Sequence, residues 1–233
     1  MEFQNEIGII QRKMAASVAG SSRRLEILHV LDIKAGQQVL DIGCGGGHLL
    51  EELAKAVGPN GKAIGLDTSQ DQLKQANEKC ALYDNASTLL GFANKINLEK
   101  NSCDAVASAQ TFEYIEDVDE SIEEVARILK PSSIFANISI LWDYYKFYGA
   151  EDNLNNLIQD TFKAHCFHQM LPTTLSGRLE KFGFKHIKHK PLPMFITTTD
   201  DNSPAKYAAE VMAQFAIQKG VSKDKVNEWQ NQL

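Results

Sequence analysis

The chain has 233 residues, of which 43% are hydrophobic and 23% charged, and its formal net charge is −6. The length and the hydrophobic fraction are those of one large globular domain. The negative charge argues against bulk electrostatic binding of DNA or RNA, which needs clustered cations.

The spacing of apolar residues predicts two helices within residues 1–34, with a break at Gly20-Ser21-Ser22. The apolar residues at helical spacing are Ile7, Ile10, Met14, Val18, Leu25, Leu28 and Leu31. Two interpretations remain open for this segment. The helices either pack on the flank of the domain or form a lid over a ligand.

The stretch 38–47 reads Gln-Val-Leu-Asp-Ile-Gly-Cys-Gly-Gly-Gly. A short apolar run of this kind is typical of a buried strand, and the glycines predict a tight turn after it. An amphipathic helix pattern begins directly after the turn. Strand, glycine turn and helix together allow the backbone to approach a nucleotide-like ligand closely.

Strands and helices alternate as far as residue 141, which predicts a parallel sheet covered on both faces. Asp67 ends the second strand, after the turn Gly58-Pro59-Asn60-Gly61. The expected strands after the first are 62–66, 88–91, 105–109 and 134–141, and helices are expected to begin near Ser69 and at Ser121.

The pattern changes after Leu141. Residues 142–148 are dense in aromatic side chains, and Phe184–Lys190 is expected to form a sixth strand. Further helices are expected at 154–167, at 173–182, around 207–215, and from Ser222 onward. We interpret residues 1–233 as a single domain with a core at 35–141 and substrate-side elements at 142–233.

The glycine turn is not that of a dinucleotide-binding site, because His48 stands where the last glycine of G-x-G-x-x-G belongs. A Walker loop is also absent. Asp41 precedes the turn, and a carboxylate there disfavours pyrophosphate and suits an amine. The turn therefore predicts an adenosine-bearing ligand that is cationic or zwitterionic.

Three motifs resemble class I S-adenosylmethionine-dependent methyltransferases. They are 39–47 (Val-Leu-Asp-Ile-Gly-Cys-Gly-Gly-Gly), 65–69 (Gly-Leu-Asp-Thr-Ser) and 126–131 (Ala-Arg-Ile-Leu-Lys-Pro). Within that superfamily the chain looks most similar to the small-molecule, type 11 branch that includes ubiquinone and menaquinone biosynthesis enzymes. The resemblance implies a Rossmann-like, doubly wound, mostly parallel sheet with helical elaborations at the N-terminus and after the fifth strand.

The resemblance also implies roles for individual residues. Asp41 would face the ammonium group of the cofactor, Asp67 would accept hydrogen bonds from both ribose hydroxyls, and Gln110 would border the transfer site. The implied cofactor-binding residues are Asp41, Gly43, Cys44, Gly45, Gly47, Asp67, Thr68, Phe92, Ala93 and Gln110. The expected substrate-side residues are Phe112, Tyr114, Trp142 and Tyr145.

Two positions depart from the family pattern. Phe92 replaces an acid that reaches the adenine amine, so packing on the ring and the Ala93 amide would have to recognise adenine. The family also closes its sheet with a seventh, antiparallel strand after a C-terminal helix, and the residues 229–233 look like that helix. The seventh strand is either absent or lies elsewhere, with Phe195–Thr199 as one option.

No catalytic base is identified from the sequence, and the candidates are His165, His168 and Tyr114. For both histidines a packing or surface role competes with the catalytic one. The aromatic residues of 142–148 are either core or walls of an apolar pocket, and their place after the fifth strand makes both equally plausible. Cys44 is expected to be a small neutral filler rather than a nucleophile.

The expected function is transfer of a methyl group from S-adenosylmethionine to a small, partly hydrophobic or aromatic acceptor. The cysteines at 44, 80, 103 and 166 form no Cys-x-x-Cys pair, which predicts reduced thiols and no metal site. No apolar run spans a membrane and no signal peptide is apparent, so a cytoplasmic monomer or homodimer without nucleic-acid or membrane partners is expected. The alternatives are an RNA or protein methyltransferase, a non-catalytic S-adenosylmethionine-binding module and, last, a nicotinamide dehydrogenase.

Overall fold

The computed structural model describes residues 5–194, 196 and 203–233. The strands of this part of the chain form one parallel sheet in the order β3-β2-β1-β4-β5. They are β1 (Gln38–Ile42), β2 (Lys62–Asp67), β3 (Ala86–Leu90), β4 (Cys103–Ala109) and β5 (Leu129–Ile138). The first five predicted strands are therefore confirmed. The strand order reverses between β1 and β4, and ligands of such sheets bind in the crevice that this reversal opens at the carboxyl ends.

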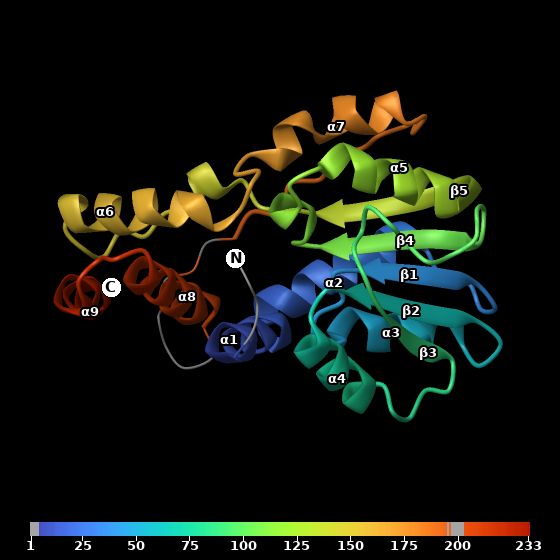
Figure 1. Cartoon of the computed structure of the whole chain (residues 1–233), viewed down its shortest axis with the longest axis horizontal. Coiled ribbons are helices and arrows are strands. Elements are labelled where there is room, and N and C mark those ends of the chain that lie inside the picture. Colours follow the sequence, from blue (N-terminus) through green and yellow to red (C-terminus); the bar gives the residue numbers. More distant parts are fainter. Residues whose placement is uncertain (1–4, 195, 197–202) are drawn as a thin grey trace.

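Helices cover both faces of the sheet (Figure 1). On one face lie α2 (Val18–Leu31), α3 (His48–Val57) and α4 (Gln70–Lys79), and on the other lie α5 (Val118–Ile128) and α7 (Leu171–Lys181). Val39 and Leu40 are neighbours on β1 and are both fully buried, one against each helical layer. This two-sided burial explains why the central strands β1, β2 and β4 are mostly apolar on both faces and do not alternate.

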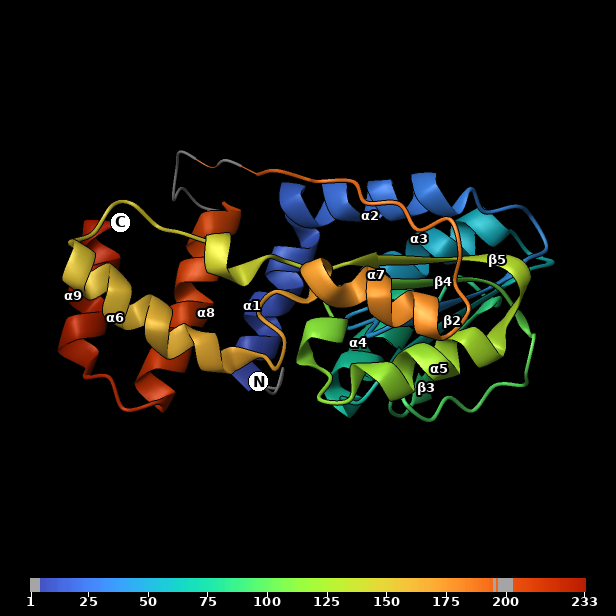
Figure 2. The same cartoon turned by 90° about the horizontal axis from the view of Figure 1, so that it is seen from above.

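A separate helical cluster lies beyond the carboxyl ends of the strands (Figure 2). We define the helical cluster as α1 (Asn5–Ala16), α6 (Asp152–Phe162), α8 (Pro204–Gln218) and α9 (Lys223–Gln232). Trp229 of α9 is fully buried in it, and its Nε1 donates a hydrogen bond to Asn155 Oδ1 of α6 at 2.7 Å. The cluster therefore has its own apolar core and stands over the ligand-binding edge of the sheet.

The N-terminal segment forms two helices, as predicted, but the break falls at Ser17 rather than at Gly20-Ser21-Ser22. Ser17 caps α2 because its Oγ accepts a hydrogen bond from the Gly20 amide. Gly20 lies inside α2, where a Cβ would stand 2.1 Å from the Ala15 carbonyl oxygen. The glycine thus permits the close junction of α1 and α2 instead of ending a helix.

β5 begins earlier than predicted, at Leu129. Leu129 pairs with Cys103 and Ile134 pairs with Ala105, so the residues between them form a bulge that accommodates Pro131. Short 3-10 turns follow β4, β5 and α6, namely η1 (Phe112–Tyr114), η2 (Trp142–Tyr144) and η3 (Lys163–His165). Among the described helices none combines the length and apolarity needed to cross a membrane.

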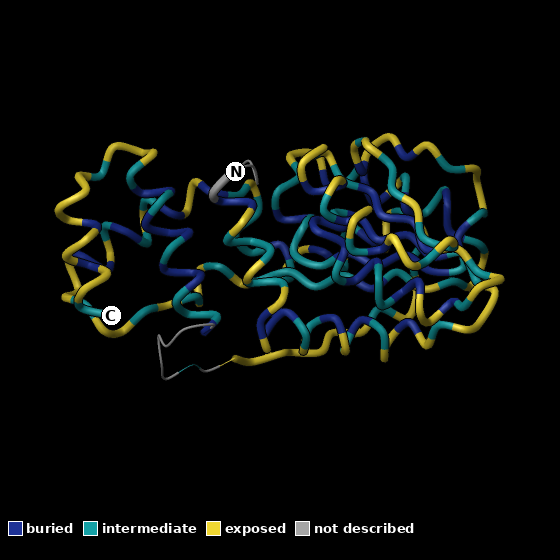
Figure 3. The backbone as a smooth tube through the Cα atoms, turned by 90° about the horizontal axis from the view of Figure 1, so that it is seen from below, coloured by how far each residue is buried: buried dark blue, intermediate teal, exposed yellow. Residues whose placement is uncertain are grey.

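The predicted sixth strand, Phe184–Lys190, is wrong, because this segment is irregular and pairs with no strand. Side chains hold it against helices instead: Lys190 Nζ lies 2.5 Å from Glu26 Oε2 of α2, and His189 Nε2 lies 2.5 Å from Ser176 Oγ of α7. The residues from 188 to 194 are exposed, and Figure 3 shows them as a strap along the surface. The suggested seventh strand at Phe195–Thr199 lies outside the described residues apart from Ile196.

Candidate active site

A connected cleft of about 3670 Å³ extends from the carboxyl ends of the strands and the helical cluster along β5, where Leu129 and Pro131 line its far end. Most of the residues that the sequence singled out line it. They are Asp41, Gly43, Cys44, Gly45, Asp67, Thr68, Phe92, Ala93, Gln110, Tyr114, Trp142, Tyr145 and His168. Gly47, Phe112 and His165 are not among the lining residues.

Gly43 begins the turn after β1 with a φ of +74°, and a Cβ there would lie 2.0 Å from Thr111 Oγ1. The amides of Gly43 and Cys44 both donate to the Leu66 carbonyl oxygen, at 2.7 and 3.0 Å. The turn is therefore fixed between the end of β2 and the loop after β4. This close approach of backbone and side chain is possible only without a side chain at position 43.

Gly47 was expected to contact the cofactor, but the structure gives it a packing role. It stands before the first turn of α3 with a φ of +81°, and a Cβ would lie 2.8 Å from the Cα of Ala76 on α4. The absence of a side chain here lets α3 and α4 pack together. Gly45 is different, because it lines the cleft and its nearest neighbour is the Gln11 side chain of α1.

Asp41 is a buried carboxyl group at the base of the turn. Burial, reinforced by the charge of Asp67, raises its pKa to about 8, while Arg24 acts in the opposite direction. Its Oδ2 atom is buried and has no hydrogen-bond partner among the described residues. An unpaired buried carboxylate oxygen is costly, so this atom points to a cationic or hydrogen-bond-donating ligand.

Asp67 ends β2 beside the glycine turn. Its Oδ2 accepts a hydrogen bond from the Gly45 amide and its Oδ1 accepts one from the Ser69 amide, both at 2.9 Å. Burial raises the pKa of Asp67 and these amide hydrogen bonds oppose the rise. Each carboxylate oxygen retains a further lone pair that a hydroxyl group can donate to.

α1 covers the glycine turn, a position that favours the lid interpretation of the N-terminal segment. The Arg12 side chain comes within 2.9 Å of a Cβ built at Gly46, and Gln11 within 3.3 Å of one built at Gly45. Arg12 Nη1 also donates to Asp71 Oδ2 at 3.3 Å and to Gln72 Oε1 at 3.2 Å on α4. Nothing in the sequence of α1 distinguishes Gln11 and Arg12 from its other polar residues, so neither was predicted as a site residue.

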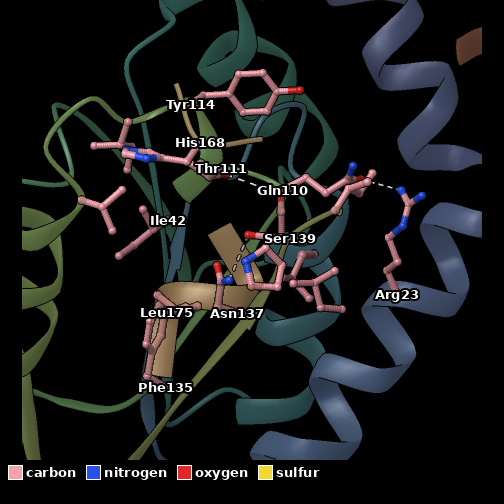
Figure 4. A pocket seen from close by; sticks show the side chains of 18 of the residues that line it. Arg23, Ile42, Gln110, Thr111, Tyr114, Phe135, Asn137, Ser139, His168 and Leu175 are labelled. Atoms are coloured by element: carbon pink, nitrogen blue, oxygen red, sulfur yellow. Dashed lines mark hydrogen bonds between the residues drawn. The ribbon is translucent and has the colours of Figure 1, made fainter. Parts of the chain in front are cut away.

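Gln110 follows β4 and has a φ of +56°, a left-handed conformation that is strained for a residue with a side chain. Its amide donates to the Ile138 carbonyl oxygen at 2.6 Å, which ties the ends of β4 and β5 together. Its Oε1 accepts a hydrogen bond from Arg23 Nη1 of α2 at 2.5 Å, and Figure 4 shows this pair at the mouth of the pocket. Like Gln11 and Arg12, Arg23 is a site residue that the sequence did not predict.

Glu113 lies behind this wall and is fully buried. Its Oε2 accepts a hydrogen bond from Ser139 Oγ at 2.8 Å, and its carbonyl oxygen accepts the amides of Phe167 and His168. Burial raises the pKa of Glu113 to about 7. The residue does not line the cleft, and its contacts join the loops that follow β4, β5 and α6.

A family of methyltransferase domains matches residues 33–219 of the chain. The chain belongs to this methyltransferase family. A protein in transposon TN4556 of Streptomyces fradiae is 31% identical over 131 residues, which are 56% of this chain and 38% of that protein. Demethylmenaquinone methyltransferase of Staphylococcus aureus is 32% identical over 111 residues, 48% of this chain and 46% of that enzyme. The chain thus spans less than half the length of the curated relatives it matches.

A solved structure supports the same conclusion. The SAM-dependent methyltransferase of Aquifex aeolicus is 26% identical and superposes with a TM-score of 0.55, over 69% of this chain and 78% of its own. The chain therefore has the fold of a class I methyltransferase domain, and S-adenosylmethionine is the cofactor that its family and this neighbour lead us to expect. The site fits that molecule, because a tight glycine turn and an unpaired Asp41 oxygen stand where the ammonium-bearing part of the ligand is expected.

Two residues expected in the methyltransferase site lie in its core instead. Phe112 is fully buried and packs against Phe135, with ring centroids 5.3 Å apart. His165 was a candidate base, but it stacks on Phe162 at 3.9 Å and lies 4.4 Å from the ring of Trp142. Burial lowers the pKa of His165 to about 4, so the methyltransferase keeps it as a neutral packing residue.

The other candidates do line the cleft. His168 Nε2 lies 3.1 Å from the Glu116 carbonyl oxygen, which orients the ring. Burial raises the pKa of Tyr114 well above its usual range, so its hydroxyl stays protonated. The rings of Trp142 and Tyr145 lie with their centroids 5.5 Å apart and pack on the helical cluster. Both residues also line the cleft. The two interpretations of the aromatic stretch therefore apply together.

Cys44 behaves as the sequence predicts. Its side chain is buried in the turn, and burial raises the pKa of its thiol well above the usual range. A thiol of this kind stays protonated at neutral pH and is a poor nucleophile. The methyltransferase thus has no cysteine nucleophile in its turn.

Proposed function

We propose that this methyltransferase acts on a small acceptor that is partly hydrophobic or aromatic. The observation that carries the proposal is the wall of the cleft beside Gln110, where Tyr114, Trp142 and Tyr145 present aromatic surface. The helical cluster stands over the same opening. An enclosed aromatic wall suits a small apolar molecule better than a nucleic acid or a folded protein.

We assign the cofactor contacts as follows. Asp67 accepts the ribose hydroxyls, Asp41 faces the ammonium group, and Gly45 lets the backbone approach the methionine part. Phe92 is 67% exposed at the end of β3, where its ring is free to pack on the adenine. Thr68, Cys44 and the Ala93 amide complete this side of the cleft.

When bound, S-adenosylmethionine supplies a methyl group that its sulfonium has already activated. The chain's own task is then to hold the acceptor in line and to keep water out. α1 and the aromatic residues after β5 close the cleft for this purpose. Of the residues considered as a base, His168 remains the best placed, because it lines the cleft and holds no buried position.

We further propose a cytoplasmic enzyme, monomeric or homodimeric, that needs no nucleic-acid partner. The net charge of −6 supports the last point. Demethylmenaquinone methyltransferase, by its name, methylates demethylmenaquinone, and its similarity to this chain is in keeping with a small-molecule acceptor.

The decisive experiment is a methyl-transfer screen of a metabolite extract with isotopically labelled S-adenosylmethionine, read by product mass. We expect at least one labelled small molecule with the wild-type protein and none with Asp67→Ala. Labelling of RNA or protein without any labelled metabolite would contradict the proposal. Binding of S-adenosylhomocysteine without labelling of any kind would instead favour a module that holds the cofactor without turnover.

A further inference from the structure

Arg23 differs from the other arginines of the chain. All five arginines lie in the part that the structure describes, and four of them pair with a carboxylate. These are Arg12 with Asp71, Arg24 with Glu52, Arg127 with Glu124 and Arg178 with Asp119. Arg23 has no carboxylate partner among the described residues, and its hydrogen bond goes to the neutral amide of Gln110.

The Arg23 side chain is also partly withdrawn from water, since the residue is half-buried. Burial lowers the pKa of Arg23, although a guanidinium of this kind stays charged at all physiological pH values. A desolvated charge without a counterion is unfavourable, so such groups in proteins normally have an anionic partner. Glu113 is the carboxylate among the groups that act on Arg23 electrostatically. Its oxygens accept hydrogen bonds from Ser139 and the Ile140 amide, and it does not line the cleft.

Arg23 lies on the acceptor side of the cleft rather than beside the cofactor turn. The ionisable groups that act on it electrostatically are Tyr145, Glu113 and Tyr114, which follow β4 and β5. The adjacent Arg24 points the other way, since it bonds Glu52 and acts on Asp41 at the base of the turn. Two consecutive arginines of α2 thus serve two different sides of the site.

The position of the Arg23 guanidinium is fixed. Gln110 accepts a hydrogen bond from one of its nitrogens and itself has a strained backbone, and Figure 4 shows the pair at the edge of the pocket. A guanidinium has five N–H donors in a planar fork, so further donors remain for a second partner. Below this polar mouth the pocket is lined by apolar side chains such as Phe135 and Leu175.

We infer that the methyl acceptor carries an anionic group, a carboxylate or a phosphate, which the Arg23 guanidinium binds beside Gln110 at the transfer site. This inference rests on the proposed small-molecule function. The acceptor is then amphiphilic, with the anion at Arg23 and an apolar body against the aromatic and aliphatic wall. An arginine fork recognises either anion through two parallel hydrogen bonds.

The test uses a library of aromatic and aliphatic carboxylic acids and phosphate monoesters, each paired with its neutral counterpart, a primary amide or an alcohol. Methyl transfer is followed by product mass for the wild type, Arg23→Gln, Arg23→Lys and Lys146→Met. Lys146 is a matched control, since it is another cation that lines the cleft, but it is exposed and bonds Gln159. Calorimetry with S-adenosylhomocysteine and its decarboxylated analogue, run on each variant, measures cofactor affinity and so shows whether the variant is folded and its cofactor site intact.

We expect the wild type and Lys146→Met to prefer the anionic member of a pair by roughly tenfold or more in kcat/KM, the usual effect of a charged hydrogen bond. Arg23→Gln should lose this preference mainly through KM, and Arg23→Lys should keep part of it. S-adenosylhomocysteine binding should stay within about twofold for all variants, because Arg23 faces the acceptor.

Two results would overturn the inference and leave the proposed function intact. One is methylation of neutral compounds with no loss in Arg23→Gln. The other is a selective loss of S-adenosylhomocysteine binding in Arg23→Gln, with binding of the decarboxylated analogue unaffected. That result would show that Arg23 binds the carboxylate of the cofactor and not that of the acceptor. If the wild type methylates no small molecule at all, the proposed function itself fails and this inference fails with it.

Discussion

Asp41 is the residue whose chemistry depends most directly on the cofactor. In the free protein its pKa is about 8, so the carboxyl group is mostly protonated at neutral pH. A bound ammonium group favours the ionised form, since it places an opposite charge at the unpaired Oδ2. Cofactor binding should then release the proton of Asp41 at pH values between the lowered pKa of the bound state and the pKa of about 8 in the free protein.

We therefore predict that the affinity for S-adenosylhomocysteine increases as the pH rises from about 6 toward 8, by at most about tenfold per pH unit. Above the pKa no proton remains to be released, and the increase should level off. Calorimetry across this range, in buffers of different ionisation enthalpy, measures both the affinity and the protons released. Asp41→Asn should bind more weakly and show a flat profile, and an unchanged pH dependence in that variant would disprove the assignment.

Asp67 provides a second test at the residue scale. Its carboxylate already orders the Gly45 and Ser69 amides, and we propose that it also accepts the ribose hydroxyls. Asp67→Ala should weaken S-adenosylhomocysteine binding by about 1.5–3 kcal/mol for each charged hydrogen bond lost. Asp84→Ala is the control, because Asp84 is an exposed acid that does not line the cleft. Equal dissociation constants for the two variants would show that the ribose lies elsewhere.

At the scale of elements, the turn after β1 and the loop after β4 interlock through Gly43 and Thr111. Gly36 allows a clean comparison, since it has a similar φ of +85° but nothing within 4 Å of a Cβ built there. Gly36→Ala should cost only the left-handed backbone strain, about 1–2 kcal/mol. Gly43→Ala should cost clearly more in urea unfolding, because its Cβ also meets Thr111. Combining Gly43→Ala with Thr111→Gly should be less destabilising than the sum of the two, and strict additivity would contradict the interlock.

The core strands were predictable because their signal is local. A strand buried on both faces carries apolar residues on both faces, and 39–42 and 105–109 show this in the sequence, each with a single polar residue, Asp41 and Ser108. The segment Phe184–Lys190 lacks the period of two of a half-buried strand, because Phe184 and Ile187, which pack on the core, are three residues apart. Its lysine and histidine side chains bond α2 and α7, and its backbone pairs with no strand. Two apolar residues in a short segment thus show that it packs on the core, and they do not show what its backbone pairs with.

The site residues also divide into those that the strand pattern predicts and those that depend on contacts between distant segments. Asp41, Asp67 and the turn glycines follow strands directly, so their place at the carboxyl edge comes from the strand pattern alone. Gln11 and Arg23 reach the cleft only because α1 packs on α8 and α2 packs on β4 and β5, and these contacts join segments that are distant in sequence. Phe112 was misplaced for a related reason, because a 3-10 turn directs its ring into the core while Tyr114 faces the cleft.

At the scale of the whole molecule, the sheet and the helical cluster have separate apolar cores. α1 connects them, since it packs on α8 and also covers the glycine turn. The stability of the helical cluster should therefore affect access to the cofactor site, while the strands keep their own stability.

Trp229→Ala tests this arrangement. Removing a fully buried tryptophan should destabilise the helical cluster by about 3–5 kcal/mol and leave Asn155 Oδ1 without its hydrogen bond. We expect hydrogen exchange measured by mass spectrometry to become faster in α6, α8, α9 and α1, and to stay slow in β1, β2 and β4.

S-adenosylhomocysteine should restore protection mainly in α1, because that helix contacts the turn that holds the ligand. Trp229→Phe, which keeps most of the packing, should show a smaller effect. A uniform loss of protection over all strands and helices would mean that the two cores unfold as one unit, and α1 would then not act as a lid that opens on its own.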